Sequence, residues 1–196
     1  IVSNIARSNN PGSQCKMIWV DETYINYLPD AVSLEPLCGS LPELVVCKSM
    51  SKCYALSGLR VAYAVSQNMA TLRRFIPPWA VSLPGQLAAV AALRNDAYYA
   101  QQYEVIHSER RKMQQALDDL GFQVFSGVAN YLLTYLPAAS GYSSTRFIEA
   151  CREQGLFVRD AHNMGVLLPN NAVRFAVRSP EENEKMLSIV DAVLAL

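Results

Sequence analysis

The sequence predicts an α/β fold in which a mostly parallel sheet flanked by helices is followed by a small α+β domain. Two observations lead to this prediction. The first half of the chain contains short, continuously apolar segments, which are typical of strands that helices cover on both faces. The second half mixes short strands with helices that carry clear end signals. We expect the boundary near Asn95, which gives domains of residues 1–95 and 96–196.

The first domain combines predicted strands with two predicted helices. The strands are rich in β-branched and aromatic residues. Residues 68–75 are predicted to form a helix that the following prolines end. A second, alanine-rich helix over residues 83–94 has Pro84 in its first turn, where proline is favoured. The predicted strands are residues 16–20, 44–47 and 59–65.

The second domain begins with a long predicted helix from Asp96 to Leu120. Gly121 follows it at the position that favours glycine after a helix. Residues 179–182 (Ser-Pro-Glu-Glu) form a capping box with proline at the first helical position, so they begin the last helix. The other predicted elements are a helix over residues 143–154 and strands over residues 122–125, 131–136, 156–159 and 173–177.

Charge and composition exclude several classes of partner. The 17 basic and 17 acidic side chains balance, so nothing indicates the basic face that nucleic acid requires. No apolar run approaches the ~20 residues of a membrane span, and no signal peptide opens the chain. We therefore expect a cytoplasmic protein without nucleic-acid or membrane partners. The five cysteines include no Cys-x-x-Cys pair and the two histidines are far apart in sequence, so we expect free thiols and no metal site.

A lysine in the loop after the second strand is the main candidate for chemistry. On its own, Lys52 would be interpreted as a solvated surface residue. However, the hydroxyls of Ser49 and Ser51 flank it, and Arg60 follows at the next strand. Hydroxyls and a guanidinium suit a phosphate group. An amine beside a phosphate site is what an imine-forming cofactor requires, provided that the amine is partly desolvated.

The run from Ser49 to Arg60 resembles the lysine signature of class I/II aminotransferases, which are pyridoxal-phosphate (PLP) enzymes of fold type I. The signature is hydroxyl-x-hydroxyl-Lys followed by small-Gly-Leu-Arg. The resemblance implies that Lys52 forms a Schiff base with PLP and that Ser49, Ser51 and Arg60 hold the cofactor phosphate. Ala62 is a departure, because many relatives have glycine there. The resemblance also implies that the first domain is the C-terminal part of the PLP-binding large domain.

The end of the first predicted strand carries a second family element, Asp-x-x-Tyr, formed by Asp21 and Tyr24. Alone, an aspartate at a strand end most often caps a turn. By resemblance, Asp21 faces the pyridine nitrogen, and its charge favours the protonated ring that acts as an electron sink. Tyr24 is expected to hydrogen-bond the ring hydroxyl. Glu22 and Thr23, between them, are assigned no role.

Two arginines of the second domain are candidates for substrate binding. Arg174 resembles the family arginine that clamps the substrate α-carboxylate, a task that suits its planar fork. Alone, it would equally be an exposed strand arginine. Arg159 is a candidate for a distal phosphate or carboxylate on the substrate. A salt bridge from Arg159 to Asp160 or another neighbour is an equally good interpretation.

The resemblance covers almost the whole chain, and the second domain is similar to the small domain of histidinol-phosphate aminotransferases and their relatives, L-threonine-phosphate decarboxylase included. Residues 1–8 have the pattern of the end of a helix and no Met precedes them, so we expect a piece of a longer protein. The family's upstream phosphate loop and Asn-Pro-x-x-Pro-x-Gly loop are absent. We therefore expect this piece alone to have a weakened or empty cofactor site.

Three functions remain open on the sequence. The first is PLP-dependent transamination between an amino acid and a 2-oxo acid, by a homodimer, with histidinol phosphate or an aromatic or neutral amino acid as the donor. The second is decarboxylation or a lyase reaction on the same fold, as in threonine-phosphate decarboxylase. The third is an inactive fragment that serves only as a dimerisation module.

Overall fold

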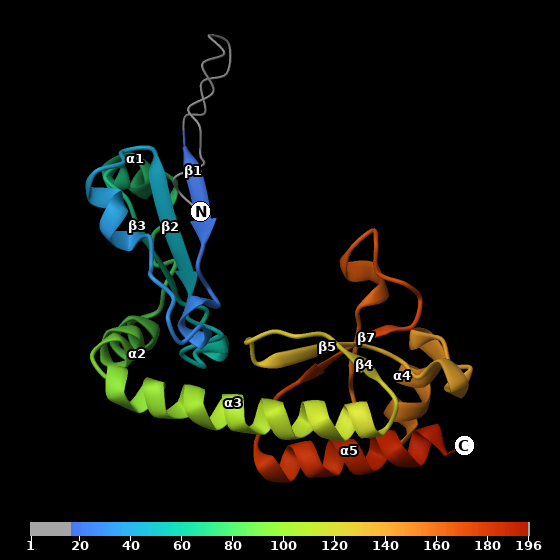
Figure 1. Cartoon of the computed structure of the whole chain (residues 1–196). Helices are drawn as coiled ribbons and strands as arrows, with labels where there is room; N and C mark the ends of the chain where they lie inside the picture. The colour runs from blue at the N-terminus through green and yellow to red at the C-terminus, as the bar shows by residue number, and fades with distance from the viewer. Residues whose placement is uncertain (1–16, 196) are drawn as a thin grey trace. The chain divides into compact units, whose positions relative to one another are not determined.

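The computed structural model describes residues 17–195, and this part of the chain forms two compact units (Figure 1). One unit contains residues 17–25 and 30–93, and the other contains residues 26–29 and 94–195. The domain boundary near Asn95 stays a prediction. The helix end predicted over residues 1–8 lies outside the described residues.

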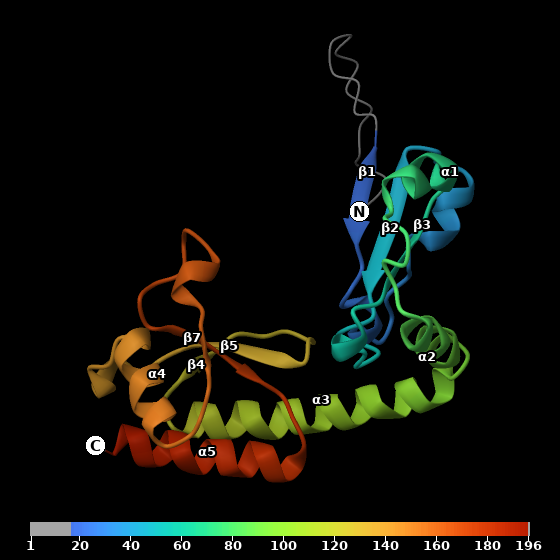
Figure 2. The same cartoon turned by 180° about the vertical axis from the view of Figure 1, so that it is seen from behind.

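A three-stranded sheet forms the centre of the first unit, in the order β1-β2-β3 (Figure 2). β1 and β2 are parallel, with Asp21 opposite Cys47, whereas β2 and β3 are antiparallel, with Ser49 opposite Ala62. The carboxyl ends of β1 and β2 and the start of β3 therefore meet at one edge of the sheet. The strands are β1 (Ile18–Asp21), β2 (Leu44–Ser49) and β3 (Ala62–Val65).

Helical segments of the first unit differ in part from the prediction. The third strand begins later than expected because residues 57–59 form a 3-10 turn, η4 (Ser57–Leu59). The single helix predicted over residues 68–75 is wrong, since a one-turn α-helix passes there into a 3-10 turn. The alanine-rich helix is present. These segments are η2 (Ile25–Tyr27), η3 (Glu35–Gly39), α1 (Met69–Leu72), η5 (Arg73–Phe75) and α2 (Leu83–Leu93).

The core of the first unit lies between the sheet and η3. Cys38 of η3 packs with Leu44 and Val46 of β2, and all three side chains are buried. Ile18, Val20, Leu34, Leu41 and Val65 are half-buried around them. Because side chains alternate along a strand, Val45, Cys47 and Ser49 belong to the opposite face of β2.

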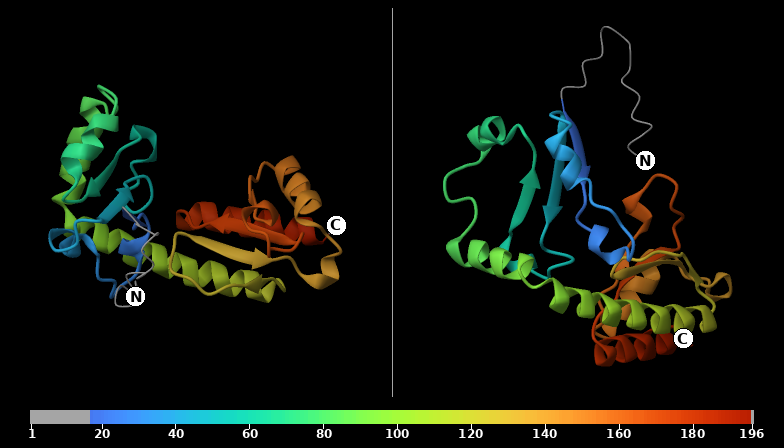
Figure 3. Two further views of the ribbon diagram at one scale, coloured as in Figure 1. Left: turned by 90° about the horizontal axis from the view of Figure 1, so that it is seen from above. Right: turned by 60° about the vertical axis from the view of Figure 1, so that its left-hand side comes forward.

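The second unit contains an antiparallel sheet in the order β4-β5-β7-β6 (Figure 3). Three helices bury their apolar side chains against it in one core, in which Phe122, Phe147 and Phe175 meet edge to face. The elements are α3 (Asp96–Asp119), β4 (Gln123–Val124), β5 (Tyr131–Tyr135), η6 (Ala138–Ser140), α4 (Ser144–Glu153), β6 (Arg159–Asp160), η7 (His162–Met164), β7 (Ala172–Ala176) and α5 (Pro180–Leu194).

The end signals of these helices behave as predicted, but one strand does not. Gly121 has φ 85° directly after α3, and Ser179 and Glu182 form the capping box of α5. The strand predicted over residues 156–159 is wrong, because only Arg159 and Asp160 pair with β7. The backbone N–H of Leu156 instead donates to the Cys151 carbonyl at 2.9 Å and closes the end of α4.

Cys38, Cys47, Cys53 and Cys151 are free thiols, whereas Cys15 lies outside the described residues. Within residues 17–195, none of the helices combines the length and the apolar character needed to span a membrane.

Candidate functional site

The predicted cofactor residues of the first unit gather at the edge where β1 and β2 end. Asp21 is the last residue of β1 and Ser49 is the last residue of β2. Ser51 and Lys52 follow Ser49, and Arg60 comes two residues before β3 begins. Carboxyl ends of parallel strands are the usual place for ligands in open α/β sheets. The fold thus collects these residues from three separate segments.

Thr23, to which the sequence assigned no role, links two of these segments. Its backbone N–H donates to Asp21 Oδ1 at 2.9 Å, and its hydroxyl donates to the same oxygen. The backbone N–H of Ser49 donates to Thr23 Oγ1 at 3.0 Å. The Cys53 thiol donates to the Thr23 carbonyl oxygen at 3.1 Å. The loop after β1 and the loop that carries Lys52 are therefore joined through one threonine.

The two serines form a pair of hydroxyls beside the lysine. Ser49 Oγ and Ser51 Oγ lie 2.8 Å apart, within hydrogen-bond distance. Met50, between them, is completely buried, and its backbone N–H donates to the Val61 carbonyl at 3.1 Å. The buried Met50 side chain anchors the loop. Ser49 and Ser51, on either side of it, are half-buried, and their hydroxyls can donate to phosphate oxygens.

Lys52 and Arg60 have exposed side chains. Arg60 has a left-handed backbone, with φ 53°, and its Nη1 donates to the Ser57 carbonyl at 3.0 Å. Among the described residues Lys52 is exposed as a whole, whereas an imine-forming amine requires partial desolvation. Asp21 is also exposed, and Tyr24 is half-buried in the loop after β1. The roles of all these residues toward a cofactor stay predictions.

A buried ionic cluster that the sequence patterns did not predict lies next to this edge. Lys48 Nζ lies 3.2 Å from Glu22 Oε2 and 2.6 Å from Glu35 Oε1. Glu22 also accepts hydrogen bonds at 2.7 Å from the Ser33 hydroxyl and from the Leu34 backbone N–H. A lysine at the end of the apolar run of β2 was the signal in the sequence.

The charges in this cluster support one another. Burial acts to lower the pKa of Lys48, but hydrogen bonds to Glu35 and Glu22 outweigh it and raise that pKa above its ordinary value. Burial acts to raise the pKa of Glu22, but hydrogen bonds from Leu34, Ser33 and Lys48 hold it below its usual range. Burial and a hydrogen bond to Glu35 raise the pKa of Tyr63. The lysine and Glu22 are therefore both charged at neutral pH.

The second unit places the two predicted substrate arginines side by side. Arg159 of β6 and Arg174 of β7 are direct partners in the antiparallel register. Directly opposed residues have neighbouring side chains on the same face of a sheet. The Arg174 guanidinium lies 4.9 Å from the centre of the Tyr131 ring, a cation–π distance. The alternative for Arg159 is wrong in one respect, because Asp160 accepts from Ser144 and from the His162 backbone and forms no ion pair with Arg159.

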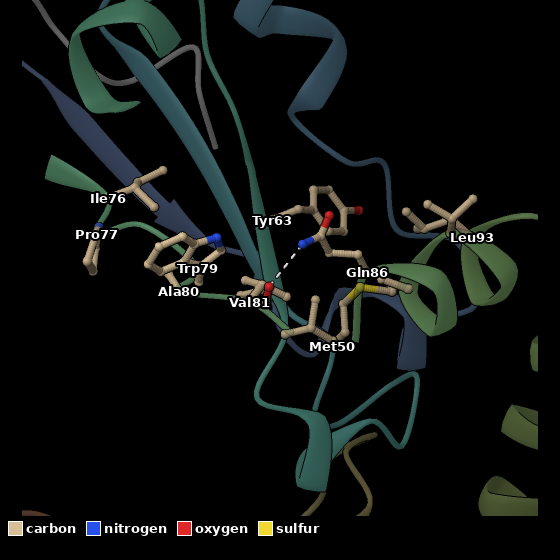
Figure 4. A pocket seen from close by; sticks show the side chains of 13 residues that line it. Met50, Tyr63, Ile76, Pro77, Trp79, Ala80, Val81, Gln86 and Leu93 are labelled. Carbon is tan, nitrogen blue, oxygen red and sulfur yellow. Dashed lines mark hydrogen bonds between the residues drawn. The ribbon is translucent and has the colours of Figure 1, made fainter. Parts of the chain in front are cut away.

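A cavity of about 550 Å³ lies elsewhere in the first unit, between β3, the loop over residues 76–81 and α2 (Figure 4). Its lining includes Met50 and Trp79, and none of the described residues that line it is charged. Gln86 turns its amide onto the Val81 carbonyl at 2.9 Å. An apolar cavity of this kind does not suit a phosphate, so the cofactor residues at the strand ends remain the better candidate site.

Comparison with known proteins identifies the family. Residues 13–190 match the family described as aminotransferase class I and II. The chain belongs to this family. It is 34% identical over 182 residues to an aromatic amino acid aminotransferase of Rhodococcus erythropolis. The aligned region covers 91% of this chain and 48% of the relative. It is 30% identical over 179 residues to a threonine-phosphate decarboxylase of Salmonella typhimurium, and the aligned region covers 89% of this chain and 48% of the relative.

Solved structures of the same family have a fold similar to that of this chain. The histidinol-phosphate aminotransferase of Clostridium acetobutylicum matches with a TM-score of 0.79 and 25% identity, over 91% of this chain and 54% of that chain. The chain thus spans about half the length of its relatives. The predictions of the family and of an α/β piece of the fold type I transferases are confirmed. Family membership also indicates pyridoxal 5'-phosphate as the cofactor, and the matched Sinorhizobium meliloti structure is of a complex with it.

Proposed function

We propose that the complete protein containing this chain is a PLP-dependent aminotransferase in which Lys52 binds the cofactor covalently. One observation carries the proposal. In a chain of this family, a carboxylate, two hydroxyls and a lysine come together at the carboxyl edge of β1 and β2, and the Thr23 hydroxyl connects Asp21 with the Ser49 backbone.

These side chains suit the cofactor's chemical groups. The hydroxyls of Ser49 and Ser51 donate to the phosphate, and the Arg60 guanidinium balances its charge. Asp21 pairs with the ring nitrogen through its carboxylate. When bound, the cofactor supplies an electron sink. Once the substrate amine has displaced it from the cofactor, the Lys52 amine would take the proton from the substrate α-carbon and return it later.

The paired arginines set the substrate class. Arg174 binds the carboxylate of an amino-acid donor, and its cation–π contact with Tyr131 helps to hold the guanidinium in position. Arg159, directly opposite, favours donors that carry a phosphate, either beside a carboxylate or, as in histidinol phosphate, in its place. Aromatic or neutral amino acids, which yield 2-oxo acids, and histidinol phosphate are the donors proposed. A homodimer and a cytoplasmic location stay predictions.

Decarboxylation is the second candidate function. Two neighbouring arginines also suit a substrate with both a phosphate and a carboxylate, and the Salmonella relative is named as a threonine-phosphate decarboxylase. Transamination needs a 2-oxo acid acceptor, whereas decarboxylation releases carbon dioxide without one. An inactive dimerisation module is the third alternative, and it predicts neither product.

The test uses the complete protein as its gene encodes it, incubated with PLP. We expect the visible absorbance band of a lysine-bound cofactor, and turnover of phenylalanine or histidinol phosphate only with a 2-oxo acid present. The Lys52→Ala variant should lose both the band and the turnover. A band of full strength in Lys52→Ala would refute the assignment, and carbon dioxide release without an acceptor would favour the decarboxylase.

A further inference from the structure

We propose that Thr23 is a positioning residue whose hydroxyl fixes the cofactor-binding carboxylate of Asp21 relative to the phosphate-binding hydroxyls of Ser49 and Ser51. The inference rests on the proposed function and extends it to a residue at an unspecified position of the Asp-x-x-Tyr element, to which no role was assigned. Thr23 itself is not required to contact substrate or cofactor.

The hydrogen bonds of the Thr23 hydroxyl have only one consistent direction. The backbone N–H of Ser49 can only donate, so Thr23 Oγ1 accepts from it at 3.0 Å. The hydroxyl proton is then directed to Asp21 Oδ1, which also accepts from the Thr23 backbone N–H at 2.9 Å. Asp21 Oδ2 receives neither of these bonds. One carboxylate oxygen is thus held by Thr23, and neither of these two bonds occupies the other.

The main chain of Thr23 is anchored to the same two loops. Its carbonyl accepts from the Cys53 thiol at 3.1 Å, and Cys53 is buried directly after Lys52. The preceding backbone N–H, of Glu22, donates to the Cys47 carbonyl at 2.9 Å and continues the β1–β2 pairing. The contacts of Thr23 therefore reach the carboxylate, the start of the serine pair and the neighbour of the lysine.

Removal of the hydroxyl has a specific consequence. In Thr23→Val the side chain keeps its shape, but Asp21 loses one donor and the Ser49 backbone N–H loses its acceptor. Both ends of the cofactor site are then less well fixed before binding. Loss of one or two hydrogen bonds of ordinary strength corresponds to a PLP dissociation constant about tenfold higher. Thr23→Ser retains the hydroxyl and should bind PLP within about twofold of wild type.

The experiment titrates the complete, PLP-free protein with PLP and follows the visible band for wild type, Thr23→Val and Thr23→Ser. Thr71→Val is the matched control, because it makes the same chemical change at an exposed residue of α1. Thermal unfolding of the PLP-free proteins is measured in parallel. We expect weaker binding only in Thr23→Val. The pH midpoint of the band of Thr23→Val should also rise. A loosely held Asp21 stabilises less positive charge on the ring nitrogen. Because positive charge on the ring opposes protonation of the Lys52 nitrogen, less of it makes that protonation easier.

Two results would overturn the inference while the proposed function stands. One is wild-type PLP affinity and an unchanged pH midpoint in Thr23→Val, whatever its unfolding temperature. The other is equal loss in Thr23→Ser, which retains the hydroxyl. If Thr23→Val does not fold, Thr23→Ala tests the same hydroxyl without the extra methyl. Absence of the visible band in wild type would instead refute the proposed function, and this inference with it.

Discussion

At the scale of single residues, neighbouring positions at the ends of β1 and β2 have different roles, one in ligand binding and one in stability. Asp21 and Ser49 are available to a ligand, whereas the adjacent Glu22 and Lys48 form a buried ion pair. Glu35 contacts the same lysine from η3. Because a buried charge is stable only with partners, this pair holds the strand ends together next to the candidate site.

Lys48→Met should destabilise the protein by about 3–5 kcal/mol, because it leaves the Glu22 carboxylate buried without its partner. The free energy of unfolding in denaturant measures the effect. Replacing both partners, as Glu22→Leu with Lys48→Met, should recover part of the loss. Wild-type stability in the single variant would show that the pair contributes nothing.

Acid should weaken the fold partly through Glu22. Its pKa is lowered in the folded protein, so its contribution to stability is present above the ordinary value of about 4.3. The contribution is lost as the pH falls through the lower, folded-state value. Glu22→Gln should therefore flatten the acid limb of a plot of unfolding free energy against pH. Identical acid limbs in both proteins would contradict this prediction.

At the scale of elements, the sequence predicted the segments well but not their hydrogen-bond partners. The residues from Ser49 to Arg60 are recognised by spacing, because they are contiguous. The Thr23–Ser49 bond and the Glu22–Lys48 pair join segments more than 20 residues apart in sequence. They depend on the register of β1 against β2, which apolar runs alone do not specify.

The loop between β2 and β3 contains a strained position at Ala55, whose φ is 55°. Left-handed backbone costs a residue with a Cβ about 1–2 kcal/mol, and glycine avoids most of that cost. Ala55→Gly should thus stabilise the protein by about 1 kcal/mol in denaturant unfolding. Ala91→Gly, the same change inside helix α2, is the control and should destabilise by about 0.5–1 kcal/mol. Loss of stability in both variants would mean that Ala55 is not strained.

At the scale of the whole molecule, the candidate residues fall into two sets. The cofactor residues belong to the first unit and the substrate arginines to the second. The sequence and the structure agree on the family and the fold. The chain spans about half the length of the relatives it matches. The exposure of Lys52 could not be predicted from its motif, because desolvation depends on everything that surrounds the amine.

The arginine pair predicts a split in substrate kinetics for the complete protein. Arg174→Lys should raise KM for phenylalanine about tenfold or more, because an ammonium cannot replace the bidentate fork. Arg159→Ala should affect histidinol phosphate far more than phenylalanine. Steady-state kinetics with both donors give the comparison. Equal effects of Arg159→Ala on the two donors would show that Arg159 does not recognise the donor's phosphate.

Covalent attachment at Lys52 is the central claim, and borohydride trapping tests it most directly. Reduction of the PLP-loaded complete protein converts a lysine-bound cofactor into a stable amine, and peptide mass spectrometry then locates the modified residue. We expect the added mass of the reduced cofactor on the peptide that contains Lys52, and on Lys52 itself after fragmentation. Modification of Lys48 or another lysine, or no modification at all, would contradict the account.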